Sequence, residues 1–208
     1  MRSVFIYAAA AWSGFFIMCL ELLGGRLLAP YFGSSVWGGI ITVFMLLLSV
    51  GYLLGGKLST KAKPQLTILG VLILSEAILA TPIILFGDST LEWLSYVCPD
   101  PRYGSMLGAF ILFGMSTVCS GMISPYAVRL LVSDVHKAGS SAGTLYFCST
   151  IGSAAGTLIT SFYLILLFEI FDIIKYAMMV SCTLGILLLL YRKNPLEHTL
   201  YKPTVKTN

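Results

Sequence analysis

Long apolar runs alternate with short polar connections along the whole chain. The six runs cover residues 4–28, 36–56, 65–87, 103–124, 142–168 and 172–191. About 20 apolar residues in a helix are enough to cross the hydrocarbon core of a bilayer. The pattern therefore predicts an all-α, polytopic membrane domain of six transmembrane helices over residues 1–191. Residues 192–208 are predicted to form a short cytoplasmic tail.

Composition supports this prediction and excludes a large soluble domain. The 208 residues are 57% hydrophobic and 11% charged, with a mean hydropathy of +0.90. Soluble domains usually carry about 25% charged residues. The apolar runs use most of the chain length, so the lipid bilayer is the main predicted environment. The first run leads into Glu21 rather than a small-residue cleavage site, so we expect it to stay as the first span.

Basic residues are distributed unevenly between the connections. If both termini are cytoplasmic, ten of the thirteen Lys and Arg residues lie on the cytoplasmic side, as the positive-inside bias requires. The remaining three are Arg26, Arg102 and Lys175. We therefore predict a bacterial cytoplasmic membrane protein with both termini inside. The basic residues do not interleave with aromatics, so nothing predicts a nucleic-acid partner.

Two glutamates fall within apolar runs. Glu21 lies in the first run and Glu76 near the middle of the third. A charge in a spanning segment costs several kcal/mol, and such residues by default suggest a functional site. We interpret both as candidate proton or cation sites facing a cavity. The alternative for Glu76 is a buried carboxyl that stays protonated or hydrogen-bonds a neighbouring helix, and for Glu21 a pairing with another helix.

Further candidate binding residues lie near interruptions in the pattern. Arg26 is a candidate counter-charge for Glu21, although five residues of regular helix place the two about 140° apart. Arg26 could instead extend towards the outer interface. Tyr31 is a further candidate binding residue, and Arg129 is either a binding residue or, preferably, an anchor at the inner face. The predicted breaks in the helices are Gly24, Gly25, Pro30 and Pro125.

Small residues predict close packing between helices. Four glycine pairs are spaced four residues apart, a spacing that lets two helices approach without intervening side chains. We expect most of these pairs to serve packing within the chain, with an oligomer interface or a sliding helix as alternatives. The pairs are Gly51 and Gly55, Gly104 and Gly108, Gly139 and Gly143, and Gly152 and Gly156.

No motif predicts a metal site, a cofactor or an enzyme activity. Four of the five cysteines lie within apolar runs, and Cys98 has no partner cysteine in its loop. His136 lies in a predicted cytoplasmic loop and His198 in the tail, so neither can act as a base within the membrane. An intramembrane enzyme that uses the two glutamates is the least supported class.

Four segments resemble the membrane part of fused "MFS/spermidine synthase" proteins, in the same order. They cover residues 21–38, 49–58, 120–130 and 142–157, within a match over roughly residues 12–170. The first reads ELLGGRLLAPYFGSSVWG and the last AGTLYFCSTIGSAAGT. The resemblance implies a fold like half of a major-facilitator transporter, whose second half would come from a homodimer or a partner chain.

The resemblance does not extend to the family's soluble aminopropyltransferase-like domain. That domain uses a Gly-rich loop to hold its nucleotide, and this chain has no such loop after the sixth run. If the chain takes part in this chemistry, the synthase-like domain is expected on a separate polypeptide. Polyamine synthesis is therefore not predicted for the chain itself.

Two functions remain open from the sequence. The first is a small transporter or permease component for a cationic or amphipathic solute, with Glu21 and Glu76 as proton or cation sites. The second is a non-catalytic membrane anchor or accessory subunit for a separate synthase-like enzyme or a larger membrane complex.

Overall fold

The computed structural model describes residues 2–33, 36–61, 65–132 and 138–191, which form helices joined by short turns. Six candidate membrane spans confirm the prediction of an all-α polytopic protein; they cover residues 3–32, 36–60, 66–97, 101–131, 138–167 and 170–191. The helical elements are α1 (Arg2–Phe32), α2 (Val36–Lys61), α3 (Leu66–Leu79), α4 (Thr81–Val97), α5 (Pro101–Leu131), α6 (Ala138–Ile159), the π-helix η2 (Thr160–Leu164), α7 (Ile165–Leu167) and α8 (Ile170–Tyr191).

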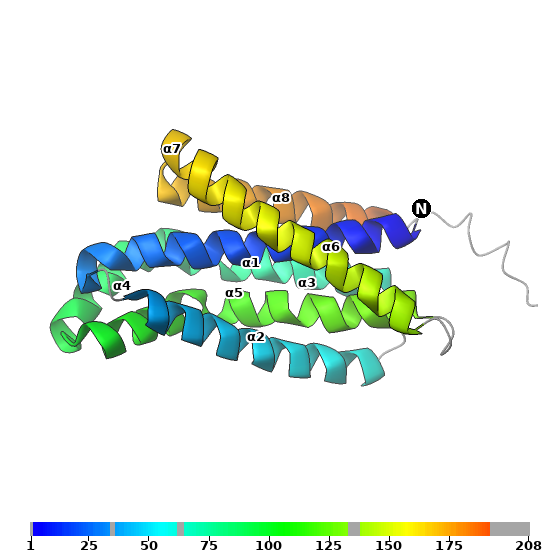
Figure 1. Ribbon diagram of the computed structural model, residues 1–208, viewed down its shortest axis with the longest axis horizontal. Coiled ribbons are helices and arrows are strands. Elements are labelled where there is room, and N and C mark those ends of the chain that lie inside the picture. The colour runs from blue at the N-terminus through cyan, green and yellow to red at the C-terminus, as the bar shows by residue number, and fades with distance from the viewer. Residues whose placement is uncertain (1, 34–35, 62–64, 133–137, 192–208) are drawn as a thin grey trace, which may run out of the picture.

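The helices lie side by side in an elongated bundle, with the spans running up and down along its long axis (Figure 1). The most extensive contacts join α2 to α5, α1 to α6, and α3 to α8. We call the end where α1 finishes and α8 begins the acidic end, because Asp88, Glu92, Asp100, Glu169 and Asp172 lie towards it. The opposite, basic end includes Lys57 and Arg129.

Glycines allow the closest helix approaches, as the spacing predicts. A Cβ atom at Gly152 or Gly156 of α6 would collide with the backbone of α1 at Ala11 or Phe15. Gly51 and Gly55 of α2 meet the backbone of α5 in the same way. These two pairs, and the pair on α5 at residues 104 and 108, therefore serve packing within the chain. Among the described residues, a Cβ atom at Gly139 or Gly143 would meet nothing within 4 Å, so this pair shows no close packing, in line with the prediction that most, not all, of the pairs pack within the chain.

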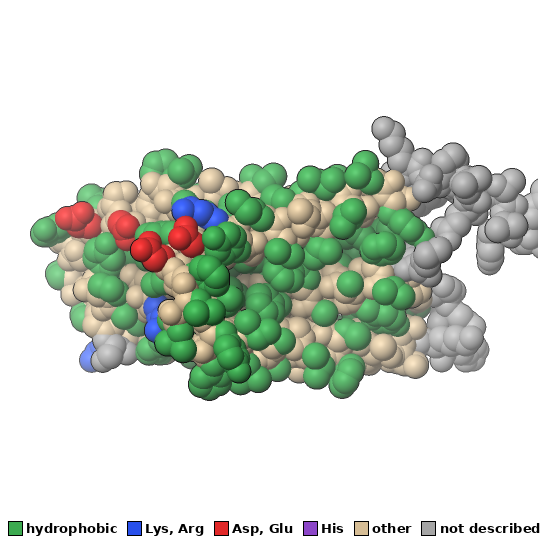
Figure 2. All heavy atoms as spheres, turned by 90° about the horizontal axis from the view of Figure 1, so that it is seen from above, with side chains coloured by type: hydrophobic (Ala, Val, Ile, Leu, Met, Phe, Trp, Pro, Cys, Tyr) green, Lys and Arg blue, Asp and Glu red, His purple; other side chains and the backbone are tan. Residues whose placement is uncertain are grey.

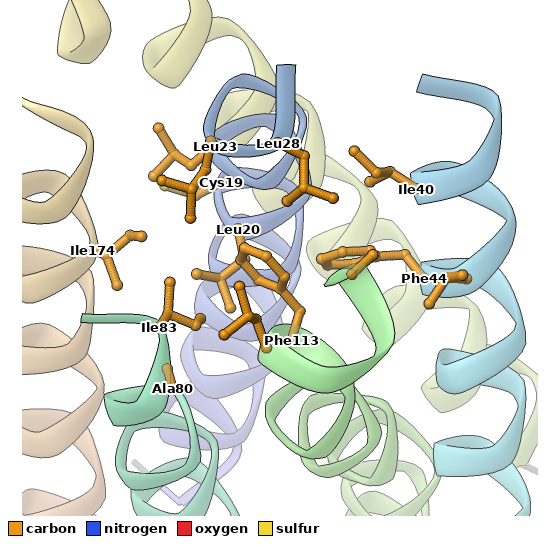
Figure 3. Packing of buried hydrophobic residues seen from close by; sticks show 14 of the residues in the cluster. Cys19, Leu20, Leu23, Leu28, Ile40, Phe44, Ala80, Ile83, Phe113 and Ile174 are labelled. Carbon is orange, nitrogen blue, oxygen red and sulfur yellow. The ribbon is translucent and has the colours of Figure 1, made fainter. Parts of the chain in front are cut away.

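Two apolar clusters fill the interior, one towards each end. The cluster at the acidic end includes Phe44 of α2 and Phe113 of α5, whose ring centroids are 5.6 Å apart (Figure 3). The cluster at the basic end is built around Ile73 and Tyr126, both fully buried. On α1, α3, α5 and α8, a short stretch with buried polar side chains separates the two clusters. The interior is therefore layered: apolar, polar, apolar.

The four predicted breaks do not interrupt their helices. α1 continues through Gly24, Gly25 and Pro30 to Phe32, and α5 continues through Pro125 to Leu131. Gly24 and Gly25 provide space: a Cβ atom there would press on the rings of Phe113 and Trp37. Tertiary packing thus maintains the helix where local propensity is low.

The prolines are tolerated because each removes only one backbone donor from a long helix. α1 ends at Phe32, two residues after Pro30. The next residue, Gly33, has a φ of 78° and forms a left-handed cap, with its N–H bonded to the carbonyl of Ala29 at 2.8 Å. The sharp change of direction therefore falls at Gly33 rather than at the predicted breaks.

The third span is interrupted instead. α3 ends at Leu79 and α4 begins at Thr81, with Pro82 in its first turn and Ala80 between them. The N–H of Ala80 bonds to Ala77 and the N–H of Ile83 bonds to Ala80, both at 3.1 Å, so a tight turn replaces the regular ladder. A proline at this position has no N–H for the carbonyl of Ile78, which explains the interruption.

Candidate functional site

Glu76 is the central residue of the buried polar layer. Its side chain is fully buried, with 0% of its surface exposed. The hydroxyl of Ser120 on α5 donates to Oε2 at 2.6 Å, and the hydroxyl of Ser181 on α8 donates to Oε1 at 3.2 Å. Both carboxyl oxygens therefore have a partner, and each partner comes from a different helix.

The network extends to the first span. The indole Nε1 of Trp12 on α1 donates to the Ser181 hydroxyl at 2.7 Å, so Ser181 accepts from Trp12 while it donates to Glu76. The hydroxyl of Ser116 donates to the backbone carbonyl of Glu76 at 2.8 Å. A continuous chain of hydrogen bonds thus links four spans, which we call the Glu76 network: Trp12, Glu76, Ser116, Ser120 and Ser181.

The network lies well inside the bundle, at a similar distance from the basic end on α1, α3 and α8. Glu76 is ten residues from the start of α3, Trp12 is ten from the start of α1, and Ser181 is ten from the end of α8. At a rise of 1.5 Å per residue, each lies about 15 Å from the basic end of its helix. That distance is half of a hydrocarbon core about 30 Å thick.

The chemistry of this site is that of a single acid held by hydroxyl donors. A carboxyl at the bilayer centre costs several kcal/mol unless its oxygens are bonded, and the serines meet that need. One carboxyl with hydroxyl partners can hold a proton or take part in binding a cation. Among the described residues, no group of three or more His, Cys, Asp or Glu side chains could hold a metal ion.

Glu21 does not join this site. It lies nine residues beyond Trp12 on α1, about 13 Å further towards the acidic end. Its side chain is half-buried, and among the described residues it makes no hydrogen bond or ion pair. Because α1 stays helical through Gly25, Glu21 and Arg26 also point in different directions, and the direct pair between them does not form.

Arg26 and Tyr31 belong to a separate groove at the acidic end. The groove measures about 680 Å³ and is lined by residues of α1, α4, α7 and α8, including Asp88 and Glu169. The Tyr31 hydroxyl donates to Oδ1 of Asp88 at 3.4 Å. The structure thus brings two predicted site residues, Arg26 and Tyr31, together with two acids that were not among the predicted site residues.

Arg129 lies at the other end of the molecule. It is exposed in the last turn of α5, nine residues from Ser120. A cation there interacts favourably with the carbonyl end of the helix dipole. This position agrees with the predicted anchor at the inner face rather than with a role beside Glu76.

Sequence reasoning missed the partners of Glu76. Serines in apolar spans usually bond to their own helix, as Ser75 does to the carbonyl of Val71 at 2.8 Å. The only signal in the sequence is the repeat of hydroxyl residues at 116, 117 and 120 of the fourth span, which marks a polar stripe without indicating what it faces.

The π-helix η2 was also not predicted. Its first residue, Thr160, has a fully buried hydroxyl with no hydrogen bond of ordinary geometry among the described residues. The nearby thiol of Cys19 is at most a weak partner. π-Helical turns are frequent at functional sites, so this segment marks a second irregular point in the bundle.

Comparisons with protein-family models, curated proteins and solved structures find no match for the chain. The resemblance to fused MFS/spermidine synthase proteins therefore remains a prediction from four sequence segments. What the structure shows on its own is an integral membrane protein of six spans with a carboxyl network at its centre.

Proposed function

We propose that the chain is a component of a membrane transporter for a small cationic or amphipathic solute, with Glu76 as its proton or cation site. The observation that carries the proposal is the Glu76 network, in which one fully buried acid accepts from serines of two helices and is linked through Ser181 to Trp12 of a third. Substrate and coupling-ion sites of secondary transporters typically lie near the bilayer midplane.

The interrupted third span supports the same proposal. Ala80, where α3 gives way to α4, follows Glu76 by four residues, about one helical turn. Discontinuous helices near the midplane are a recurring feature of transporter sites. Glu76 is fully enclosed in this conformation, so access from either side requires helices to separate. The interruption provides a place where the two halves of the third span can move independently.

Glu76→Gln tests this proposal, because it keeps the shape of the side chain and removes its charge. Purified protein in liposomes is assayed for uptake of putrescine, choline and ethidium under an imposed pH gradient and membrane potential. We expect the rate of protein-dependent uptake to fall about tenfold in the variant, which corresponds to about 1.4 kcal/mol of activation free energy. Glu92→Gln is the matched control, because Glu92 is an exposed acid outside the network.

Two outcomes would contradict the proposal. One is uptake of all three probes no faster than in protein-free liposomes. The other is unchanged uptake in both Glu76→Gln and Glu21→Gln, which tests the second predicted acid separately. Loss of uptake in Glu21→Gln alone would show that the proton or cation site is Glu21 in the first span rather than Glu76.

The second candidate function is an accessory membrane subunit. It is favoured by the outward face of α6 and the following π-helix η2, which exposes the large apolar side chains of Tyr146, Phe147 and Ile151 on α6 and Phe162 on η2. A partner chain would cover this face. A stoichiometric partner retained during purification in mild detergent would favour this function over a self-contained transporter.

A further inference from the structure

The groove at the acidic end combines an apolar wall with charges of both signs. Its apolar lining includes Leu27 of α1. Phe168 and Phe171, at the connection between α7 and α8, also contribute. Arg26 provides a positive charge, and Asp88 and Glu169 provide negative charges. Its volume of about 680 Å³ lies within the range of small-molecule sites. Figure 2 shows acidic side chains gathered at this end of the molecule with basic ones close by.

The charged side chains of the groove do not form ion pairs with one another. The only ion pair among the described residues joins Lys175 to Asp172 at 2.9 Å, outside the groove lining. In the same part of the chain, Arg26 and the Glu169 carboxylate make no hydrogen bond or ion pair, and Asp88 has only the long bond from Tyr31. The groove therefore offers a free cationic group and two largely free anionic groups to a ligand.

The depth of the three charges indicates the kind of ligand. Arg26 lies fourteen residues beyond Trp12, Asp88 lies twelve beyond Glu76, and Glu169 lies twelve before Ser181. With the Glu76 network taken as the midplane, these separations put the three charges about 18 to 21 Å from it along the helices. The hydrocarbon core ends about 15 Å from the midplane and the head groups extend to about 20 Å or slightly more. All three charges thus lie at the level of phospholipid head groups.

We propose that this groove binds a phospholipid with a zwitterionic head group that ends in a primary ammonium. The guanidinium fork of Arg26 matches the phosphate, and the three N–H donors of the ammonium match Asp88 and Glu169. The first carbons of the acyl chains lie against Leu27, Phe168 and Phe171. This binding goes beyond the transport proposed above and does not depend on it.

Native mass spectrometry of the detergent-purified full chain, titrated with defined lipids, tests the proposal. We expect phosphatidylethanolamine to bind more tightly than phosphatidylglycerol, which lacks the ammonium, and than phosphatidylcholine, whose methylated nitrogen has no N–H donor. Arg26→Gln and Asp88→Asn are each expected to weaken phosphatidylethanolamine binding about fivefold, because each turns a charge-assisted hydrogen bond into a weaker neutral one. Arg102→Gln and Glu92→Gln are controls, since both are exposed charges near the acidic end outside the groove.

Arg26→Lys keeps the charge but not the guanidinium fork, so it is expected to weaken binding less than Arg26→Gln does, which separates loss of a contact from loss of fold. Equal binding of the three lipids would overturn the proposal. So would unchanged binding in both groove variants, or equal weakening in the controls. Competition by soluble glycerophosphoethanolamine at the same concentration as the lipid would also overturn it, because the occupant would then be a soluble solute.

Discussion

The carboxyl of Glu76 shows how a polar residue is accommodated in the middle of an apolar bundle. Its two oxygens accept from Ser120 and Ser181, and Ser181 in turn accepts from Trp12. In water each of these groups would bond to solvent, but inside a membrane an unpaired group costs several kcal/mol. The same bonds that satisfy Glu76 therefore also hold α1, α3, α5 and α8 in register.

Ser120→Ala is expected to destabilise the bundle, because it leaves Oε2 of Glu76 without its donor. Measured hydrogen bonds between membrane helices suggest a loss of about 0.6 to 1.7 kcal/mol. Thermal unfolding of the purified protein in detergent measures the change. Ser75→Ala is the matched control, since Ser75 bonds only to the carbonyl of Val71 in its own helix. An equal effect of both substitutions would contradict a special role for the network.

At the scale of the elements, glycine positions decide which helices approach most closely. α6 lies against α1 through Gly152 and Gly156, and the same helix carries Gly143 with open space around it. Both ends of α6 read as small-residue motifs in the sequence. Only the contacts distinguish the packed pair from the open one, because spacing defines a face of the helix but not its neighbour.

Gly152→Ala is expected to force α6 away from α1, because the added methyl group meets the backbone of Ala11. Overpacking of this kind costs about 1 to 3 kcal/mol. Gly143→Ala on the same helix meets no other described residue and is expected to be neutral or to stabilise by up to about 1 kcal/mol through helix propensity. Thermal unfolding of the two variants side by side measures the difference. A loss of stability in Gly143→Ala as large as in Gly152→Ala would contradict this assignment.

The whole molecule is a six-span bundle with opposite charge character at its two ends. Acidic side chains lie at the end that holds the groove, whereas Lys57 and Arg129 lie at the other. The positive-inside bias predicts that the basic end faces the cytoplasm. The structure defines the two ends but contains no membrane, so the orientation remains a prediction.

Cysteine labelling of intact cells tests this orientation. In a Cys98→Ser background, Tyr96→Cys is expected to react with a membrane-impermeant maleimide, because Tyr96 is 79% exposed near the acidic end. Thr60→Cys, exposed at the basic end, is expected to react only after the cells are permeabilised. The reverse pattern would place the acidic end in the cytoplasm.

The number of spans, their approximate positions and the charge asymmetry followed from the sequence alone. Hydropathy, run length and charge are local properties, and they determine whether each segment crosses the bilayer and in which direction. The same reasoning singled out Glu76, because an acid in an apolar run is costly wherever its neighbours lie. It did not foresee that packing keeps the helices continuous through Gly24, Gly25, Pro30 and Pro125.

Only the tertiary structure decided what each charge meets. Ser181 is 105 residues from Glu76 and Trp12 is 169 residues from Ser181, so no local pattern could pair them. The groove likewise joins Arg26 to Asp88 and Glu169 across three spans, while Glu21 is left outside both sites. Contacts between helices depend on how whole faces pack, which is why the sequence determined the spans and the packing determined the sites.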